Sequence, residues 1–360
     1  MESYLWHLLI LFADTTLWKR KILKKERVDV VFISNFRDDD ERKKYLLYSQ
    51  KNAPFIDGFR MTLGDVYGRL KIINSDTHEL LTIKGRRKAK KQFVLATQWA
   101  VNNGAKVVLL AASTKRLFGR DAKELKEKFP NIIFTIGDNG TAHLLMEDTF
   151  QAIEENGISK DRMKIVVLGA YGILGEAMVE ALLMRDYTII AVGDNLSRLE
   201  MIRKYHDVEI TTEIESLENI DLIVACTHKK ELQLTGAIIE KIKPKERQLI
   251  VIDVAEPANL TKEVYEKNRD LVIRQDAGNG YSKNINYILG ALSYKKLSLS
   301  KGVLFGCFAE AMALGESLKS NRYQDENWFE VNSYNIEIVA NMFTELNIKI
   351  PKIRCFGEIL

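Results

Sequence analysis

One glycine-containing turn constrains the fold of this chain more than any other feature. A short β-branched run, Lys164 to Leu168, predicts a buried parallel strand, and Gly169, Gly172 and Gly175 follow it at intervals of three. A helical apolar pattern over residues 177–184 comes next. A strand, a glycine turn and a helix in this order are typical of a site that binds a dinucleotide.

Each glycine would have its own physical role in such a turn. The first allows the tight turn, the second lets the backbone approach a pyrophosphate, and the third lets the helix pack close to its strand. The free N–H groups at the helix N-terminus attract phosphates. The predicted cofactor contacts are Gly169, Ala170, Tyr171, Gly172, Ile173, Leu174 and Gly175. An ordinary βα turn is the alternative, because Tyr171 stands where the commonest form of the motif has its second glycine.

An acidic residue follows the next predicted strand and bears on the choice of cofactor. Asp194 lies 19 residues after Gly175, where a carboxylate can accept both ribose hydroxyls and would repel a 2′-phosphate. The expected cofactor is therefore NADH or NADPH, with NADH favoured by Asp194; a plain turn residue is the alternative. Thr227 and Asp253 follow later strands, and we expect them at the same carboxyl edge of the sheet, where ligands bind.

Length and periodicity predict an α/β protein of more than one domain. A chain of 360 residues exceeds one ordinary domain. Strands alternate with helices, which predicts an N-terminal α/β substrate domain at 28–155 and a Rossmann-type doubly wound parallel sheet at 156–300. The pattern at 301–360 is helical, and these C-terminal helices are expected to close back on the first domain.

Charge and cysteine content exclude several classes of protein. The net charge is only +4, so nucleic acid is not expected as a partner. The cysteines Cys226, Cys307 and Cys355 are scattered, which predicts reduced thiols in a cytoplasmic protein and no metal site.

The first 27 residues form an apolar and basic N-terminal extension. Residues 4–12 are mostly apolar, and the following stretch to residue 27 is rich in lysine and arginine. No run of 18 apolar residues predicts a membrane span. The extension is expected either to dock as a helix on the protein or to give the protein peripheral contact with an anionic membrane surface.

Cys307 is the candidate catalytic nucleophile. It lies near the start of a predicted helix, where a thiolate would be stabilised. The alternative is a buried cysteine in a helix of small residues. The stretch from Val303 to Leu314, which contains Cys-Phe-Ala-Glu-Ala-Met, resembles the active-site segment of the cyanobacterial long-chain acyl-[acyl-carrier-protein] reductases. The turn at 169–175 and the segment 135–142 are also similar to that family.

This resemblance implies a reaction and partners. Cys307 would be acylated by the thioester of an acyl carrier protein or acyl-CoA, and a reduced nicotinamide would then release a fatty aldehyde. The family has a histidine where Gly140 stands here, and an arginine suited to a 2′-phosphate where Asp194 stands. Basic residues at 84–91 would dock an acidic carrier protein, or else form a solvated helix face.

Two other functions fit the same layout. One is an amino-acid or shikimate-type NAD(P)-dependent dehydrogenase, for which Lys115 and Asp138 would supply a polar pair and Cys307 would be dispensable. The other is a non-catalytic nucleotide-binding module.

Overall fold

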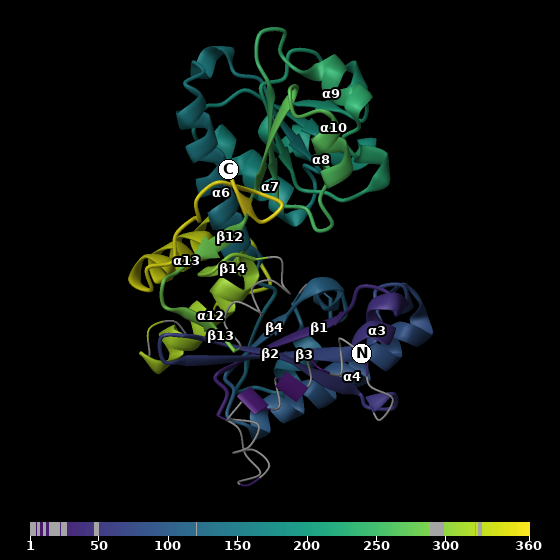
Figure 1. The fold of residues 1–360 in the computed structure, drawn as a ribbon, viewed down its shortest axis with the longest axis vertical. Coiled ribbons are helices and arrows are strands. Elements are labelled where there is room, and N and C mark those ends of the chain that lie inside the picture. Colours follow the sequence, from purple (N-terminus) through teal and green to yellow (C-terminus); the bar gives the residue numbers. More distant parts are fainter. Residues whose placement is uncertain are drawn as a thin grey trace. The chain divides into compact units, whose positions relative to one another are not determined.

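The computed structural model describes residues 27–46, 50–119, 121–288, 299–320, 322 and 326–360, and nearer the N-terminus residues 5, 8, 9, 12, 13 and 22. These residues belong to two compact units, coloured along the chain in Figure 1. Unit 1 comprises Met1–Asn139, Tyr281–Glu330 and Glu337–Ile348, and unit 2 comprises Gly140–Gly280, Val331–Ile336 and Lys349–Leu360. Most of the expected apolar and basic extension at 1–27 lies outside the described residues.

Unit 1 is built on a six-stranded mixed sheet with the order β13-β2-β3-β1-β4-β5. The strands are β1 (Val30–Phe36), β2 (Phe55–Leu63), β3 (Val66–Asp76), β4 (Val107–Leu110), β5 (Ile133–Thr135) and β13 (Ile285–Tyr287). Strand β1 pairs in parallel with β3 and β4, and β4 pairs in parallel with β5. Strand β2 runs antiparallel to β3 and β13. The segments that leave β1, β3, β4 and β5 therefore start at one edge of the sheet.

Unit 1 also contains helices from both parts of the chain. They are α3 (Asp39–Tyr45), α4 (Ile83–Asn102), α5 (Lys123–Lys128), α12 (Gly306–Lys319) and the larger part of α13 (Ser333–Glu345), with short 3-10 turns η2 (Glu79–Leu81) and η3 (Ala112–Arg116). The ring of Phe308 lies 4.5 Å from that of Phe32, and a Cβ on Gly315 would lie 2.6 Å from Val30 Cγ2. The small residues of α12 thus let it lie close to the sheet, and the expected return of the C-terminal helices to the first domain is confirmed.

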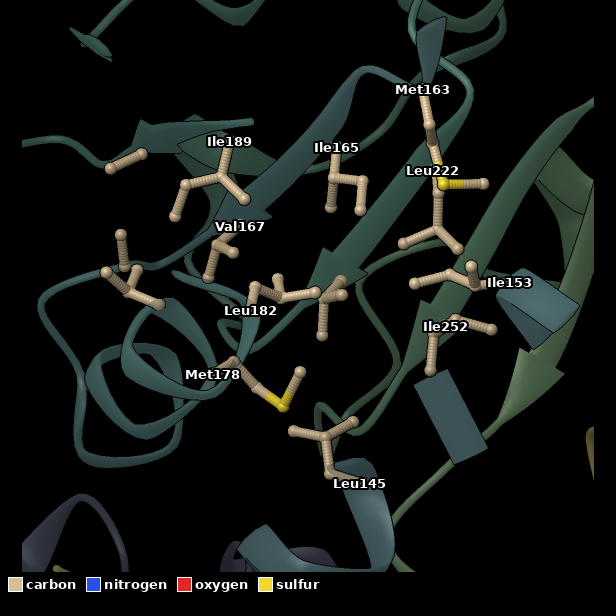
Figure 2. Packing of buried hydrophobic residues seen from close by; sticks show 14 of the residues in the cluster. Leu145, Ile153, Met163, Ile165, Val167, Met178, Leu182, Ile189, Leu222 and Ile252 are labelled. Carbon is tan, nitrogen blue, oxygen red and sulfur yellow. The ribbon is translucent and has the colours of Figure 1, made fainter. Parts of the chain in front are cut away.

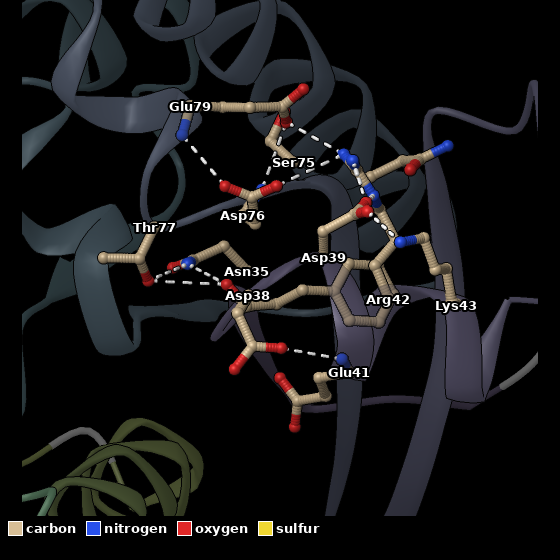
Figure 3. Close-up of polar contacts among 12 residues, drawn as sticks. Asn35, Asp38, Asp39, Glu41, Arg42, Lys43, Ser75, Asp76, Thr77 and Glu79 are labelled. Atoms are coloured by element: carbon tan, nitrogen blue, oxygen red, sulfur yellow. Dashed lines mark hydrogen bonds and ion pairs between the residues drawn. The ribbon is translucent and has the colours of Figure 1, made fainter.

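A polar network holds α3 at the end of β3, as Figure 3 shows. Asp38 caps α3, because its Oδ1 accepts from the Glu41 N–H at 2.7 Å. The Arg42 guanidinium lies 3.1 Å from a Glu79 carboxylate oxygen and 3.5 Å from an Asp76 oxygen. These charges satisfy one another and fix the connection between β3 and α4.

Unit 2 contains a six-stranded parallel sheet with the order β11-β10-β9-β6-β7-β8. Its strands are β6 (Ile165–Leu168), β7 (Ile189–Val192), β8 (Glu209–Thr211), β9 (Leu222–Ala225), β10 (Leu249–Asp253) and β11 (Val272–Asp276). Its helices are α6 (Asp138–Asn156, of which the first two residues belong to unit 1), α7 (Ile173–Leu183), α8 (Leu196–His206), α9 (Gly236–Ile242) and α10 (Lys262–Lys267), with turns η4 (Lys160–Arg162), η5 (Ile214–Ser216) and η6 (Lys230–Leu232). With β6 counted as the first strand, the order is that of the Rossmann fold, so the expected α/β fold class is confirmed.

Both faces of this sheet are buried, which explains the continuous apolar runs in the sequence. Ile165 and Val167 of β6 pack into one apolar cluster with Met178 and Leu182 of α7 (Figure 2). The alternate residues Val166 and Leu168 belong to a second cluster on the other face. Short strands β12 (Asn279–Tyr281), β14 (Val303–Phe305), β15 (Arg354–Cys355) and β16 (Glu358–Ile359) lie outside the two main sheets.

Within the described part of the chain, no helix has the length and apolar character needed to cross a membrane.

Candidate functional site

The glycine turn after β6 has the geometry that its sequence predicts. Gly169 adopts φ +86°, which favours glycine, and a Cβ there would lie 2.7 Å from the Cβ of Thr227. A Cβ on Gly175 would lie 2.2 Å from the Gly169 carbonyl oxygen. The first and third glycines are therefore required by the turn and by the close approach of α7 to β6.

The start of α7 fits the phosphates of a dinucleotide. Gly172 is the N-cap residue and no side chain caps the helix, so the first N–H groups of α7 are available to an anion. Ala170 is buried and Leu174 packs against the core, whereas Ile173 is exposed. Together with Tyr171, these three residues form the turn. The turn and the start of α7 fit the pyrophosphate of NADH or NADPH.

Thr227 joins this site from a neighbouring strand. It follows β9, which pairs with β6 at the point where the strand order reverses, and this is where ligands bind in open α/β sheets. The structure therefore brings Thr227 and the glycine turn together. Contact of either with the cofactor stays a prediction.

Asp194 follows β7 at the same edge, but it is not alone there. Its Oδ2 lies 2.5 Å from the Lys229 ammonium nitrogen, and Lys229 follows β9. The Arg198 guanidinium carbon of α8 lies 4.4 Å from the ring centroid of Tyr171. Sequence reasoning missed both cations: Lys229 is 35 residues away from its partner in the chain, whereas Arg198 follows Asp194 by only four residues and was visible in the sequence.

Asp253 ends β10 and is almost fully buried. Its carboxylate accepts from the N–H groups of Ala255, Asn259 and Leu260 at 3.1–3.3 Å and lies 3.2 Å from Arg274. Burial raises the pKa of Asp253, although Arg274 and these N–H groups oppose the shift. Asp253 thus fixes the loop after β10 through these contacts. The predicted role of Asp253 in cofactor binding stays a prediction.

In unit 1, a lysine and a carboxylate meet at the carboxyl edge of the sheet. Lys115 lies in η3, directly after β4, and Asp138 follows β5 at the start of α6; their side chains form an ion pair. Asp138 is 8% exposed and Lys115 26%. Burial lowers the pKa of Lys115, but Asp138, Cys307 and Glu310 outweigh it, so the pKa is raised and the side chain is charged at neutral pH.

Cys307 is the second residue of α12 and belongs to the same cluster. Burial raises the pKa of the Cys307 thiol to about 11, despite the opposing effect of Lys115. The side chain is therefore a thiol at neutral pH, although it lies at a helix N-terminus as expected. Cys226 is also a thiol at neutral pH, because burial raises its pKa well above the usual range.

Glu310, one turn after Cys307, was missed by sequence reasoning. It is fully buried and accepts a hydrogen bond from the Thr135 hydroxyl, whose oxygen in turn accepts from the Gly137 N–H at 2.8 Å. The signal in the sequence was a lone carboxylate among the small apolar residues of a helix. This chain of contacts links α12 to the loop that carries Asp138.

Part of unit 2 matches a known family. Residues 152–276 match the family model described as shikimate/quinate 5-dehydrogenase. No curated protein sequence matches the chain.

Solved structures with a similar chain course include several enzymes. The nucleotide-binding domain of glutamyl-tRNA reductase from Thermoplasma volcanium has 19% identity and a TM-score of 0.27, over 36% of this chain and 84% of that one. L-tryptophan dehydrogenase from Nostoc punctiforme has 13% identity and a TM-score of 0.41, over 89% of each chain. Shikimate 5-dehydrogenase from Thermus thermophilus, in complex with shikimate, has 12% identity and a TM-score of 0.38, over 89% of this chain and all of that one. Likeness at this level carries no argument about activity.

The match corrects the predicted family and reaction. The resemblance to long-chain acyl-[acyl-carrier-protein] reductases was wrong, because residues 152–276 match the shikimate/quinate dehydrogenase family instead. Reduction of a fatty acyl thioester to an aldehyde through a Cys307 acyl-enzyme was also wrong. A thiol with a pKa of about 11 gives the physical reason, since it offers almost no thiolate at neutral pH.

The more general prediction, of an oxidoreductase that uses a nicotinamide cofactor, is confirmed. The chain is an NAD(P)-dependent oxidoreductase, and its cofactor is NADH or NADPH.

Proposed function

We propose that this protein is a dehydrogenase of the shikimate or amino-acid type, which interconverts a small polar alcohol or amine and the corresponding carbonyl compound. The observation that carries the proposal is the ion pair of Lys115 with Asp138 at the carboxyl edge of the unit 1 sheet. The family match of residues 152–276 supports this substrate class over a fatty thioester.

The pair is suited to general acid–base chemistry. The nicotinamide cofactor supplies or accepts the hydride. When a carbonyl is reduced, the Lys115 ammonium donates a proton to the carbonyl oxygen, and when an alcohol is oxidised, neutral Lys115 takes the hydroxyl proton. Asp138 holds the lysine in place and stabilises its charged form, which agrees with the raised pKa of Lys115.

The remaining polar groups keep this pair in position. Glu310 and Thr135 anchor the loop before Asp138, and Cys307 fills the adjoining space as a neutral thiol. No acyl-enzyme is needed, because hydride and proton transfer complete the oxidation of an alcohol. Oxidation of an amine to a carbonyl compound also consumes one water and releases ammonia, and reduction of the carbonyl compound to the amine does the reverse.

A substrate panel tests the proposal. Purified protein is incubated with NAD⁺ or NADP⁺ and shikimate, quinate, several 2-hydroxy acids and several amino acids, and reduced nicotinamide is followed by absorbance. Lys115→Met and Asp138→Asn should lower kcat about 10²–10⁴-fold on the substrate that turns over, with the Kd of the cofactor unchanged. The control Lys128→Met removes an exposed lysine of α5 and should keep full activity. Absence of turnover on every class, or full activity of Lys115→Met, would refute the proposal.

We also propose peripheral contact with an anionic membrane surface. In α4, Ile83 and Leu95 are exposed at 76% and 50%, and the same face carries Arg87 and Lys91, for which no partner is seen among the described residues. These four side chains recur every four residues, and with Lys84 and Lys88 they line a groove of about 620 Å³. Exposed apolar and cationic side chains on one helix face favour an anionic lipid surface.

Vesicle sedimentation distinguishes this contact. Arg87→Glu/Lys91→Glu should lose binding to vesicles of 70% phosphatidylcholine and 30% phosphatidylserine, while deletion of residues 1–27 tests the N-terminal extension separately. Equal sedimentation with pure phosphatidylcholine would contradict an electrostatic contact. Binding of an acyl carrier protein or acyl-CoA stays a prediction, because no contact in the structure bears on it.

A further inference from the structure

Three charged side chains are linked through one another or through Tyr171 at the end of β7 in unit 2, where a dinucleotide places its adenosine ribose. Asp194 Oδ2 and Lys229 Nζ are 2.5 Å apart. Arg198 donates from Nη2 to the Tyr171 carbonyl oxygen at 3.5 Å, and its guanidinium covers the Tyr171 ring. The cluster therefore combines one carboxylate with two cations.

Tyr171 brings the two cations to the same place. A Cβ on Gly193 would lie 2.4 Å from Tyr171 Cε1, so the ring packs closely against the backbone just before Asp194. The Tyr171 hydroxyl is 3.5 Å from Lys229 Nζ on one side, and Arg198 stacks on the ring. The tyrosine that replaces the usual second glycine of the turn thus acts as a platform between Lys229 and Arg198.

This arrangement changes what Asp194 implies about the cofactor. An acidic residue by itself repels a 2′-phosphate. Here Lys229 neutralises the carboxylate, and Arg198 leaves the cluster with a net positive charge. Lys229 is 47% exposed and Asp194 27%, so the pair is open to solvent and can exchange partners.

We propose that Lys229 is a specificity-determining residue of the cofactor site, which binds the 2′-phosphate of NADPH together with Arg198 and lets the protein use NADPH as well as NADH. With NADH, Asp194 accepts hydrogen bonds from the ribose hydroxyls and Lys229 keeps its ion pair with Asp194. With NADPH, the phosphate takes the place of Asp194 as the partner of Lys229. The proposal concerns cofactor binding alone and does not depend on the substrate.

Binding without substrate tests it. The Kd values of NADH and NADPH are measured with the full chain by nicotinamide fluorescence and by calorimetry, for the natural protein, Lys229→Gln, Asp194→Asn and the control Lys230→Gln. Lys230 is the exposed neighbour of Lys229 and loses the same charge when it is replaced. A charge-assisted hydrogen bond contributes about tenfold or more in affinity.

Distinct results are expected for each variant. Lys229→Gln should weaken NADPH binding about tenfold or more and change NADH binding by less than about threefold. Asp194→Asn should weaken NADH and strengthen NADPH binding, and Lys230→Gln should change neither. A natural protein that binds NADPH more than about a hundredfold more weakly than NADH would overturn the proposal. Equal losses for both cofactors in Lys229→Gln would also overturn it. Absence of substrate turnover would leave these Kd values unaffected, so failure of the proposed function is seen separately.

Discussion

Gly137 and Cys307 pack so closely that a Cβ added to Gly137 would lie 2.4 Å from the Cβ of Cys307 and 2.6 Å from its Cα. Gly137 also adopts φ +73°, which a side chain disfavours. This contact joins the loop before Asp138 to the first turn of α12, so it helps to set the position of the proposed acid–base pair.

The first prediction concerns stability. Gly137→Ala should lower the free energy of unfolding by roughly 3 kcal/mol or more, because backbone strain adds to a clash that no flexible side chain can relieve. Urea unfolding measures this loss. Gly119→Ala is the control, since Gly119 has φ +77° and nothing within 4 Å, so only the strain of about 1–2 kcal/mol is expected. Equal losses in both variants would show that the contact with Cys307 does not matter.

The second prediction is a pH dependence. Because the pKa of Lys115 lies above its ordinary value of 10.5, the lysine is protonated throughout the neutral range. Carbonyl reduction, which uses the protonated form, should stay level with rising pH and fall only above that value. Alcohol oxidation, which uses the neutral form, should rise with pH over the same range. Steady-state kcat in both directions measures this, and a reduction rate that falls between pH 6 and 8 would contradict it.

The third prediction assigns Glu310 a positioning role. Glu310→Gln keeps an oxygen that can accept from Thr135 but removes a negative charge near Lys115, so the pKa of Lys115 should fall. The descending limb of the reduction profile should therefore move to lower pH, with little change in KM. Glu316→Gln, at a less buried position of the same helix, is the control. If the descending limb of the pH profile does not move, the role of Glu310 is purely structural.

The fourth prediction concerns the glycine turn. Gly175→Ala places a Cβ 2.2 Å from the Gly169 carbonyl oxygen, which must displace α7 from β6. Affinity for NADH and NADPH should fall about tenfold or more as the helix N-terminus moves away from the phosphates. Calorimetry provides the Kd. Gly157→Ala, with nothing within 4 Å of its Cβ, should leave cofactor binding intact.

The fifth prediction distinguishes a catalytic Cys307 from a Cys307 that only fills space beside Lys115 and Asp138. Cys307→Ala keeps the Cβ that packs against Gly137, and it should retain activity within about threefold, a difference below 1 kcal/mol in the barrier. With a thiol pKa of about 11, alkylation by iodoacetamide should be slow at pH 7 and increase about tenfold per pH unit up to that value. Rapid alkylation at neutral pH, or loss of activity in Cys307→Ala, would contradict this prediction and indicate that Cys307 is catalytic.

Local patterns in the sequence were enough to predict the Rossmann unit. The run from Ile165 to Leu168 is apolar because both faces of its strand are covered, and Gly169 and Gly175 are glycines because a Cβ would meet backbone or Thr227. These are short-range requirements, so they appear as contiguous signals. The family suggested by the segment around Cys307 was wrong, as the match of residues 152–276 shows, and that short segment could not show whether its thiol is ionised.

What the sequence by itself determined is therefore the α/β fold class, the glycine turn after β6 and the class of cofactor. Only the tertiary structure decided which polar groups meet: Lys115 with Asp138, Thr135 with Glu310, and Asp194 with Lys229. These partners lie 23, 175 and 35 residues apart in the chain. The effect of a charged or ionisable side chain depends on burial and on neighbours within a few ångströms. Strand order, together with the packing of α12 on the sheet, brings residues so distant in sequence into contact.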